Sequence, residues 1–475
     1  MGSAARESEE RFAAYVESLA GVLGHSDRVG PLRDYCTGLL MPGERKSVEP
    51  IAAIVAPSRA AAEHQSLLHF VGQSAWSDEA MLGKVRELVM PALAAQGGVE
   101  ALIVDDTGMA KKGSHSVGVA RQYCGRLGKT DNCQIAVTLS LANHQASLPI
   151  AYRLYLPEAW ANDAERRRKA HIPEDVEFRT KPEIALSQIK AAQMAGAARG
   201  VVLADAGYGV DGAFRAGVTA LGLSYAVGVQ STLSVWGPGQ EPLPAKPWSG
   251  RGRPPSRVRR DGDHRPVAAK PFAMQLPAEA WKDVDWREGS NQTLSSRFAA
   301  VRIRPASRDH KLATPHPVEW LVIEWPEAEA EPAKYWLSTL PENTPIDRLV
   351  DVIKLRWRIE RDYEELKSEL GLAHFEGRGW RGFHHHASLC IAAYGFLIFE
   401  RAAFSPSARW SREKPAVSGR TRSTRATDPS RTARGQLDRH YAKAIDDRPR
   451  QIPLSMPVLP RRVGKTELQS TFVTQ

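Results

Sequence analysis

Helical periodicity marks the first part of the chain. Apolar residues recur every three or four positions through residues 12–23 and again around residues 67–71, which is the spacing of amphipathic helices. Ser77 and Asp78 supply an N-cap for a third helix over residues 79–94, which ends before Gly97 and Gly98. We therefore predict a helical region over residues 1–97.

After residue 98 the pattern changes to short apolar runs, which are typical of buried strands. Three adjacent strands are followed by alternating helices and strands, which favours an α/β fold with helices covering a mixed sheet. The predicted strands span residues 101–104, 133–141, 147–156, 201–204 and 223–229, and the predicted helices span residues 181–197 and 213–220.

Residues 230–345 interrupt this alternation. They are rich in Pro and Trp and contain strand-like pieces over residues 297–303, 320–325 and 335–340, which predicts a β-rich insertion. A long helix over residues 346–371 and another over 384–399 then return to the core. From residue 405 Arg, Ser, Thr and Pro dominate, which predicts a basic, disordered tail. The predicted segments are therefore residues 1–97, 98–229, 230–345, 346–404 and 405–475.

The composition is that of a globular protein, with 42% hydrophobic and 25% charged residues among 475. No apolar run approaches the ~20 residues of a membrane span. The polar first residues do not resemble a signal peptide, so we expect a cytoplasmic protein without a membrane partner. The four cysteines are scattered, which favours reduced thiols over zinc ligands or disulfides. The net charge of +10 indicates a polyanionic partner.

Acidic residues stand at the ends of predicted buried elements. Asp105 and Asp106 follow the first strand, Asp205 follows a later strand, and Glu360 lies on the long helix. One chemistry that uses carboxylates in such places is the cleavage and joining of phosphodiesters. It needs an activated oxygen nucleophile and a stabilised transition state, and two Mg²⁺ ions about 3.5–4 Å apart supply both. Mg²⁺ prefers oxygen ligands such as carboxylates. Taken singly, each residue has an alternative role, because a strand-end Asp often caps a turn and a helical Glu often faces solvent.

The helix that carries Glu360 also carries two cations beside it. At 100° per residue, Arg356, Glu360 and Lys367 lie within about 40° of one another. The apolar stripe of the same helix is centred about 70° away, so the three charges border the buried face. A carboxylate flanked by two cations there suits a metal and phosphate site.

This spacing resembles the Y-x2-R-x3-E-x6-K signature of the DDE transposases of bacterial insertion sequences. Arg356, Glu360 and Lys367 match it, whereas Ile353 occupies the Tyr position, a departure that concerns contacts to the DNA end rather than the metal chemistry. Further stretches similar to one group of these enzymes are Asp105-Asp-Thr-Gly-Met-Ala-Lys-Lys-Gly113, Ser116-Val-Gly-Val-Ala-Arg-Gln-Tyr123, Asp131-Asn-Cys-Gln134, Asp205-Ala-Gly-Tyr-Gly209 and Arg45-Lys-Ser-Val-Glu-Pro50.

The resemblance implies an RNase H-like mixed-sheet core with a β-rich insertion and an N-terminal helical DNA-binding domain. It implies that Asp106, Asp205 and Glu360 hold two Mg²⁺ ions, for which Mn²⁺ can substitute. Aligning the Asp-Thr pair favours Asp106 as the first ligand, with Asp105 as the alternative. Arg356 and Lys367 are then expected to bind DNA phosphates.

The function implied is that of a transposase, which cleaves the ends of a mobile element and joins them to target DNA. The expected partners are the terminal repeats, the target DNA and a second copy of the chain, because an element has two ends to bring together. The resemblance implies a bacterial protein that is nucleoid-associated when bound. A catalytically silent, DNA-binding relative is the alternative, and the intact carboxylates argue against it. A glycosidase needs only two acids and would leave the basic charge unexplained.

Further candidate DNA contacts lie outside the carboxylate site. Arg251 and Arg253 stand in a Gly/Pro-rich loop that resembles an AT-hook core, whose arginines lie along the narrow minor groove of A·T-rich DNA. An exposed charged loop without a partner is the other interpretation. Lys111 and Lys112 follow the first acidic pair and are candidates for the DNA backbone.

Aromatic and histidine residues offer weaker signals. Trp236 and Trp248 in the insertion are candidates for stacking on a base flipped from the element end, although most tryptophans pack in cores. His384, His385 and His386 point in different directions on a helix, which makes them a poor chelate, so we assign them no metal site.

Overall fold

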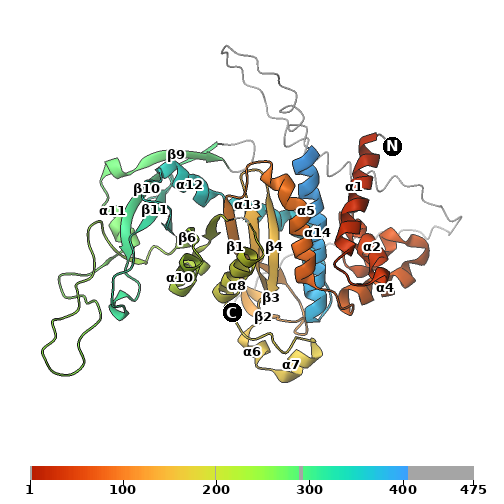
Figure 1. The fold of residues 1–475 in the computed structure, drawn as a ribbon, viewed down its shortest axis with the longest axis horizontal. Coiled ribbons are helices and arrows are strands. Elements are labelled where there is room, and N and C mark those ends of the chain that lie inside the picture. The colour runs from red at the N-terminus through yellow and green to blue at the C-terminus, as the bar shows by residue number, and fades with distance from the viewer. Residues whose placement is uncertain (1–2, 198, 288–292, 405–475) are drawn as a thin grey trace, which may run out of the picture.

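The computed structural model describes residues 3–197, 199–287 and 293–404 (Figure 1). Helices at the N-terminal end, a large mixed sheet and a long C-terminal helix form the mixed α/β fold that the sequence predicts. The predicted disordered tail, from residue 405, lies outside the described residues. Among the helices described, none combines the length and the apolar character needed to cross a lipid bilayer.

Five helices precede the sheet, in the region where the sequence shows helical periodicity. The last of them begins with the predicted cap, because the Ser77 hydroxyl accepts the Ala80 backbone N–H at 3.0 Å. The five helices are α1 (Ser3–Ala20), α2 (Val29–Leu40), α3 (Val48–Val55), α4 (Ala60–Gly72) and α5 (Asp78–Ala94).

The N-terminal helices pack against the last described helix, α14 (Trp380–Phe404). Helices α5 and α14 lie side by side (Figure 1), and Gly395 permits their close approach, because a Cβ there would lie 2.8 Å from Val85. The Tyr15 hydroxyl of α1 donates to the Ala392 carbonyl of α14 at 2.9 Å. Residues of α1, α2, α4, α5 and α14 share one hydrophobic cluster with one face of the sheet.

The central sheet has the strand order of an RNase H-like core. β3 pairs antiparallel with β1 and β4, whereas β5 and β6 run parallel to β1, which gives the order β4-β3-β1-β5-β6. A short strand, β2, pairs with the first part of β3. The strands are β1 (Ala101–Ala110), β2 (Ala120–Cys124), β3 (Lys129–Ala142), β4 (Ser147–Leu154), β5 (Val201–Ala204) and β6 (Tyr225–Val229). The connecting helices are α6 (Glu158–Ala161), α7 (Ala164–Lys169), α8 (Lys181–Met194), α9 (Ala206–Gly209) and α10 (Gly212–Ala220).

β1 is longer than the sequence predicts. It continues past Val104 to Ala110, because β3 pairs with it along its whole length, from Ala101 opposite Ala142 to Ala110 opposite Cys133. The pairing with β5 ends earlier, at Ile103. Asp105 and Asp106 therefore do not end the strand, but they lie where one of its two neighbours stops.

The predicted insertion continues the core sheet. β12 pairs antiparallel with β6, and the order then runs through β11 and β10 to β7 and β8, with β9 paired to β10. The insertion thus adds strands to the core sheet edge. Its elements are β7 (Ser234–Trp236), β8 (Val267–Ala268), α11 (Ala269–Met274), β9 (Lys282–Arg287), β10 (Thr293–Pro305), β11 (Glu319–Trp325) and β12 (Lys334–Ser338).

The predicted long helix over residues 346–371 is interrupted, so that prediction is wrong in detail. It divides into α12 (Ile346–Lys354), α13 (Trp357–Glu364) and a π-helical turn (Glu365–Glu369). Between α12 and α13 the backbone bonds span three residues, as from the Ile359 N–H to the Arg356 carbonyl at 3.2 Å, and in the π-turn they span five. Residues 346–370 contain no Pro or Gly that would signal these changes.

Candidate active site

The two faces of β1 are covered by different helices. Ala101 and Ile103 belong to a hydrophobic cluster with residues of α12 and α13, whereas Leu102 and Val104 belong to the cluster that includes α8. Side chains alternate between the faces of a strand. Asp105 therefore faces α13, and Asp106 faces α8.

Contacts of Asp105 agree with this placement. Its Oδ2 lies 3.1 Å from Nη1 of Arg356, at the start of α13. The residue opposite on β3, Thr138, shares a hydrogen bond of 2.5 Å with the Tyr363 hydroxyl of α13. Burial first, and then the charges of Asp205 and Asp106, raise the pKa of Asp105 to about 7, although the neighbouring Arg356 lowers it. Among the described residues, Arg356 is the cation that lowers this pKa, and it does not offset the burial and the two aspartates.

Asp106 has a cation of its own on the other face of the sheet. Its Oδ2 lies 2.6 Å from Nζ of Lys181, the first residue of α8, and both side chains are about 30% exposed. Thr180 caps this helix with a capping box, which fixes the start of the helix and therefore the position of Lys181. Sequence patterns do not predict the contact with Lys181, because the two residues lie far apart in the chain.

Asp205 lies directly after β5, at the position that corresponds to Asp105 in the register of the two strands. Ile103 is paired with Leu203 in parallel register, and the same register continued by two residues brings Asp205 beside Asp105. Its Oδ1 accepts the Gly207 N–H at 2.9 Å and so caps α9. Gly209 allows α9 to lie on β6, because a Cβ there would lie 1.8 Å from the Gly228 carbonyl oxygen.

Glu360 is joined to Asp105 through Arg356. Nη2 of Arg356 lies 3.2 Å from Oε1 of Glu360, whose side chain is 68% exposed. Arg356, Glu360 and Asp205 border one cleft, in which Trp357 contributes an aromatic side chain. The other residues lining this cleft are Ala206, Gly228, Val229, Ala333, Lys334, Tyr335, Trp336, Ile353 and Lys354.

Lys367 lies in the π-turn rather than on an ideal helix. Its Nζ donates to the Gly108 carbonyl of β1 at 3.2 Å and lies 5.4 Å from the centre of the Tyr363 ring. The angles predicted for Arg356, Glu360 and Lys367 assume one ideal helix and do not apply to Lys367 in the π-helical turn. Both cations nevertheless contact β1, Arg356 at Asp105 and Lys367 at Gly108.

Two tyrosines, one partly buried and one buried, border the carboxylates and were not identified from the sequence. Tyr363 has the spacing of an apolar helix position, yet its hydroxyl is bonded to Thr138 beside Asp105. Tyr208, within the Asp205-Ala-Gly-Tyr-Gly209 stretch, is 2% exposed. Burial raises the pKa of each phenol, and nearby aspartates, Asp105 among them, raise it further, so both stay protonated. A Tyr at helical or turn spacing carries no sequence signal that separates this role from core packing.

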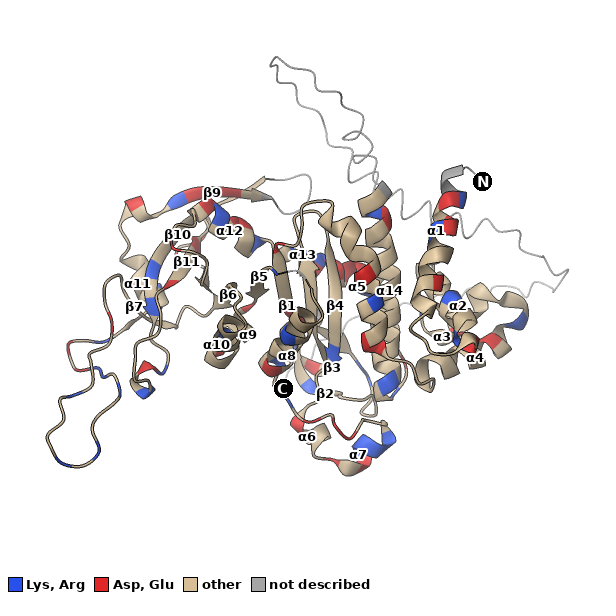
Figure 2. Cartoon of the chain, viewed as in Figure 1, with Lys and Arg blue, Asp and Glu red and all other residues tan. Residues whose placement is uncertain are grey.

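The remaining predicted DNA contacts lie in different environments. Arg251 and Arg253 are exposed on the long loop between β7 and β8, which extends away from the sheet and carries several basic residues (Figure 2). Lys112 is exposed, whereas Nζ of Lys111 donates to the Phe375 carbonyl at 2.6 Å, and burial lowers its pKa.

Tryptophan and histidine positions separate clearly. Trp236 is 1% exposed and donates to Asp309 at 2.7 Å, so it is a core residue, whereas Trp248 is 56% exposed. The three consecutive histidines are buried, and each bonds a different backbone carbonyl. The four cysteines are free and buried.

Comparison with known proteins gives evidence that is independent of the site geometry. Residues 18–293 match the family model described as DDE superfamily endonuclease, a range that contains Asp105 and Asp205 but ends before Glu360. A probable transposase for insertion sequence element IS701 of Microchaete diplosiphon is 35% identical over 195 residues, which cover 41% of this chain and 47% of that protein. The chain thus spans about half the length of this curated relative.

A solved structure is also similar at a low level. The piggyBac transposase synaptic complex with hairpin DNA matches with a TM-score of 0.40 and 9% identity, over 89% of this chain and 72% of that one. A likeness this weak adds no support. The family match covers more than half of the chain and includes Asp105 and Asp205, which each stand two residues after the paired positions Ile103 and Leu203 of two parallel strands. The chain belongs to the DDE superfamily of endonucleases.

Proposed function

We propose that this protein is a DNA transposase that cleaves the ends of a mobile element and joins them to target DNA. The observation that carries the proposal is the register of Asp105 and Asp205 on the face of the sheet covered by α13, where Arg356 connects Asp105 to Glu360. Family membership and the name of the IS701 relative support the same reaction.

The residues present fit divalent metal ions. Asp105, Asp205 and Glu360 offer carboxylate oxygens, which Mg²⁺ prefers, and Mn²⁺ accepts the same ligands. The raised pKa of Asp105 reflects burial beside other carboxylates, which a bound cation would offset. When bound, two Mg²⁺ ions would activate the attacking oxygen and stabilise the charge on the phosphate.

Asp105 is our proposed first ligand in place of Asp106. The Asp-Thr alignment favours Asp106, but that carboxylate is paired with Lys181 on the α8 face. Asp105 shares its face with Asp205 and with the helix of Glu360. A ligand set drawn from one face needs no rearrangement of β1.

Basic residues would hold the DNA. Arg356 lies between two carboxylates, and Lys367 reaches β1 at Gly108, three residues after Asp105, so both would bind phosphates flanking the cut. Lys112 is exposed for the backbone, and Arg251 and Arg253 form the minor-groove contact. Lys111 is the least available, because it already bonds Phe375. We further propose a homodimer on DNA, because two element ends must be cut together.

The test is a cleavage assay with Mg²⁺ and labelled DNA that carries the element's own ends. Glu360→Gln is expected to abolish cleavage and to keep DNA binding. Glu364→Gln is the matched control, because Glu364 is exposed one turn further along the same helix. This variant should cleave DNA normally. Binding without cleavage by the unaltered protein would favour the catalytically silent alternative.

A further inference from the structure

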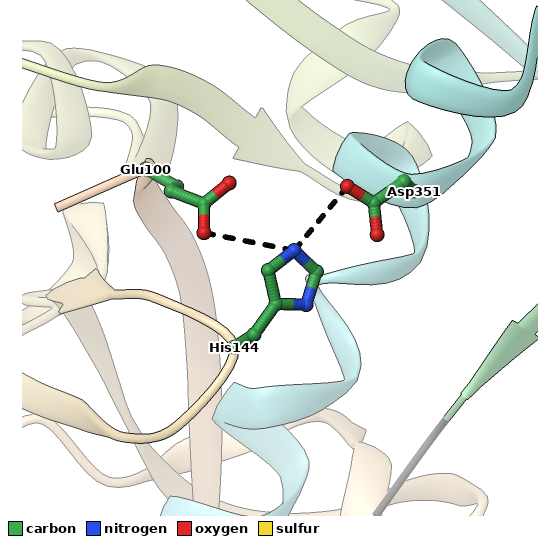
Figure 3. A group of neighbouring side chains, drawn as sticks. All are labelled: Glu100, His144 and Asp351. Atoms are coloured by element: carbon green, nitrogen blue, oxygen red, sulfur yellow. Dashed lines mark ion pairs between the residues drawn. The ribbon is translucent and has the colours of Figure 1, made fainter. Parts of the chain in front are cut away.

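Three potential metal ligands meet at a place that the proposed reaction does not use. Glu100 precedes β1, His144 lies in the turn between β3 and β4, and Asp351 lies on α12 (Figure 3). Figure 3 shows the imidazole pointing between the two carboxylates. None of the three borders the cleft of Asp205 and Glu360.

The distances within this group match a shared metal better than direct hydrogen bonds. Nε2 of His144 lies 3.2 Å from Oδ2 of Asp351 and 3.6 Å from Oε1 of Glu100. With metal–ligand distances of about 2.0–2.2 Å, two donors of a tetrahedral zinc ion lie roughly 3.4 Å apart. A direct N–H···O bond instead prefers about 2.9 Å.

The surroundings hold the donors in place. Asn143 is buried, and its side chain bonds the carbonyls of Leu93 and Gly98 as well as the N–H groups of Gln145 and Ala146. The turn that carries His144 is therefore fixed before any ion binds, which lowers the entropy cost of binding.

Arg348 forms ion pairs with both carboxylates. Its guanidinium lies 2.9 Å from Oε2 of Glu100 and 2.5 Å from Oδ2 of Asp351. Glu100 thus offers one oxygen to the arginine and the other to the histidine. Oδ2 of Asp351 contacts both Arg348 and His144, which the two lone pairs of a carboxylate oxygen permit. Hydrogen bonds of this kind commonly orient metal-ligating carboxylates. With His144 neutral, Glu100, Asp351 and Arg348 leave a net charge of −1 for a cation to offset.

We propose that Glu100, His144 and Asp351 bind a Zn²⁺ ion that fastens α12 to the start of β1. One imidazole and two carboxylates are a donor set that zinc accepts, and the half-exposed group leaves the fourth position to water. α12 leads directly to Arg356, and β1 carries Asp105, so the ion would fix the two elements on which the carboxylate site depends. The zinc site stands whether or not the chain is a transposase.

Co²⁺ is the probe, because tetrahedral Co²⁺ absorbs visible light strongly and can be displaced by Zn²⁺. The full chain without a polyhistidine tag is stripped with a chelator and titrated with Co²⁺ in excess Mg²⁺, which favours the all-carboxylate site. We expect one equivalent to give visible absorption that Zn²⁺ removes. Zn²⁺ should also raise the melting temperature.

Both signals should disappear in His144→Ala, whose side chain is 40% exposed and whose loss should leave the fold intact by circular dichroism. Asp351→Asn should weaken Co²⁺ binding at least about 10-fold. Glu360→Gln and His310→Ala, at an exposed histidine, should keep the absorption unchanged. The proposal fails if no absorption develops, if it persists in His144→Ala, or if Glu360→Gln removes it. An ion-pair cluster with protonated His144 would give the first of these outcomes.

Discussion

At position 105 the pleat of one strand decides which of two adjacent carboxylates reaches α13. Asp105 and Asp106 are chemically identical, but one is bonded to Arg356 and the other to Lys181. We propose that the residue on the α13 side shares an ion with Asp205, because it needs no movement of the strand. The distinction can be measured residue by residue.

We expect Asp105→Asn to reduce end cleavage by about 10³-fold or more, because a metal ligand supports several kcal/mol of transition-state stabilisation. Asp106→Asn should retain most activity and lose only the ion pair with Lys181, which is worth about 1 kcal/mol or less at this exposure. Single-turnover cleavage rates in Mg²⁺, with DNA binding measured in parallel, compare the two variants. The reverse order of activities would return the role to Asp106.

At the scale of elements, α12 is anchored to the insertion through a buried ion pair. Nζ of Lys354, at the end of α12, lies 2.8 and 2.9 Å from the two oxygens of Glu324 on β11. It also lies 4.0 Å from the centre of the Trp286 ring. Both charged side chains are at most 10% exposed. This ion pair lies just before the interruption between α12 and α13, which positions Arg356 and Glu360.

Lys354→Met should lower the free energy of unfolding by about 3–5 kcal/mol, because it leaves the Glu324 carboxylate buried without its main cation. Adding Glu324→Leu should recover most of the loss, since the pair is then replaced by apolar side chains. Lys169→Met is the control, because its pair with Glu165 is exposed and should change stability by less than about 1 kcal/mol. Urea unfolding of the four proteins checks the order, and a double variant no more stable than Lys354→Met would contradict it.

At the scale of the whole molecule, basic residues on one loop offer a contact for a polyanion. The chain carries a net charge of +10, and the loop between β7 and β8 extends basic residues away from the carboxylate cleft (Figure 2). A contact made there would lie apart from the cut. It would add affinity mainly through release of counterions from phosphates.

Replacing both Arg251 and Arg253 by Ala should lessen the slope of log affinity against log salt by about 2, since each lost phosphate contact contributes roughly 0.9. Replacing both by Lys should keep the slope, because the charge remains, but should weaken any preference for A·T-rich DNA, because the planar guanidinium is lost. Fluorescence anisotropy at several salt concentrations measures both effects. An unchanged slope in the Ala variant would show that the loop does not touch DNA.

The sequence by itself determined the local features of this protein. The apolar run of β5 has the predicted bounds, Ser77 caps α5 as predicted, and the alternation of strands and helices predicts the mixed sheet. These features follow from periodicity and capping, which depend on neighbours within a few residues. Asp105, Asp106 and Asp205 were identified for the same reason, from the apolar runs that precede them, although β1 continues past Asp106 to Ala110.

Only the tertiary structure decided which side chains meet. Asp105 faces α13 because α12 and α13, some 250 residues later, cover that face of β1, and the helix breaks at Arg356 although its local sequence is uniformly helical. The pairing of β12 with β6 and the packing of α1 and α5 on α14 likewise join distant segments. Burial between distant segments assigns a face or ends a helix, and no pattern within a short window contains that information.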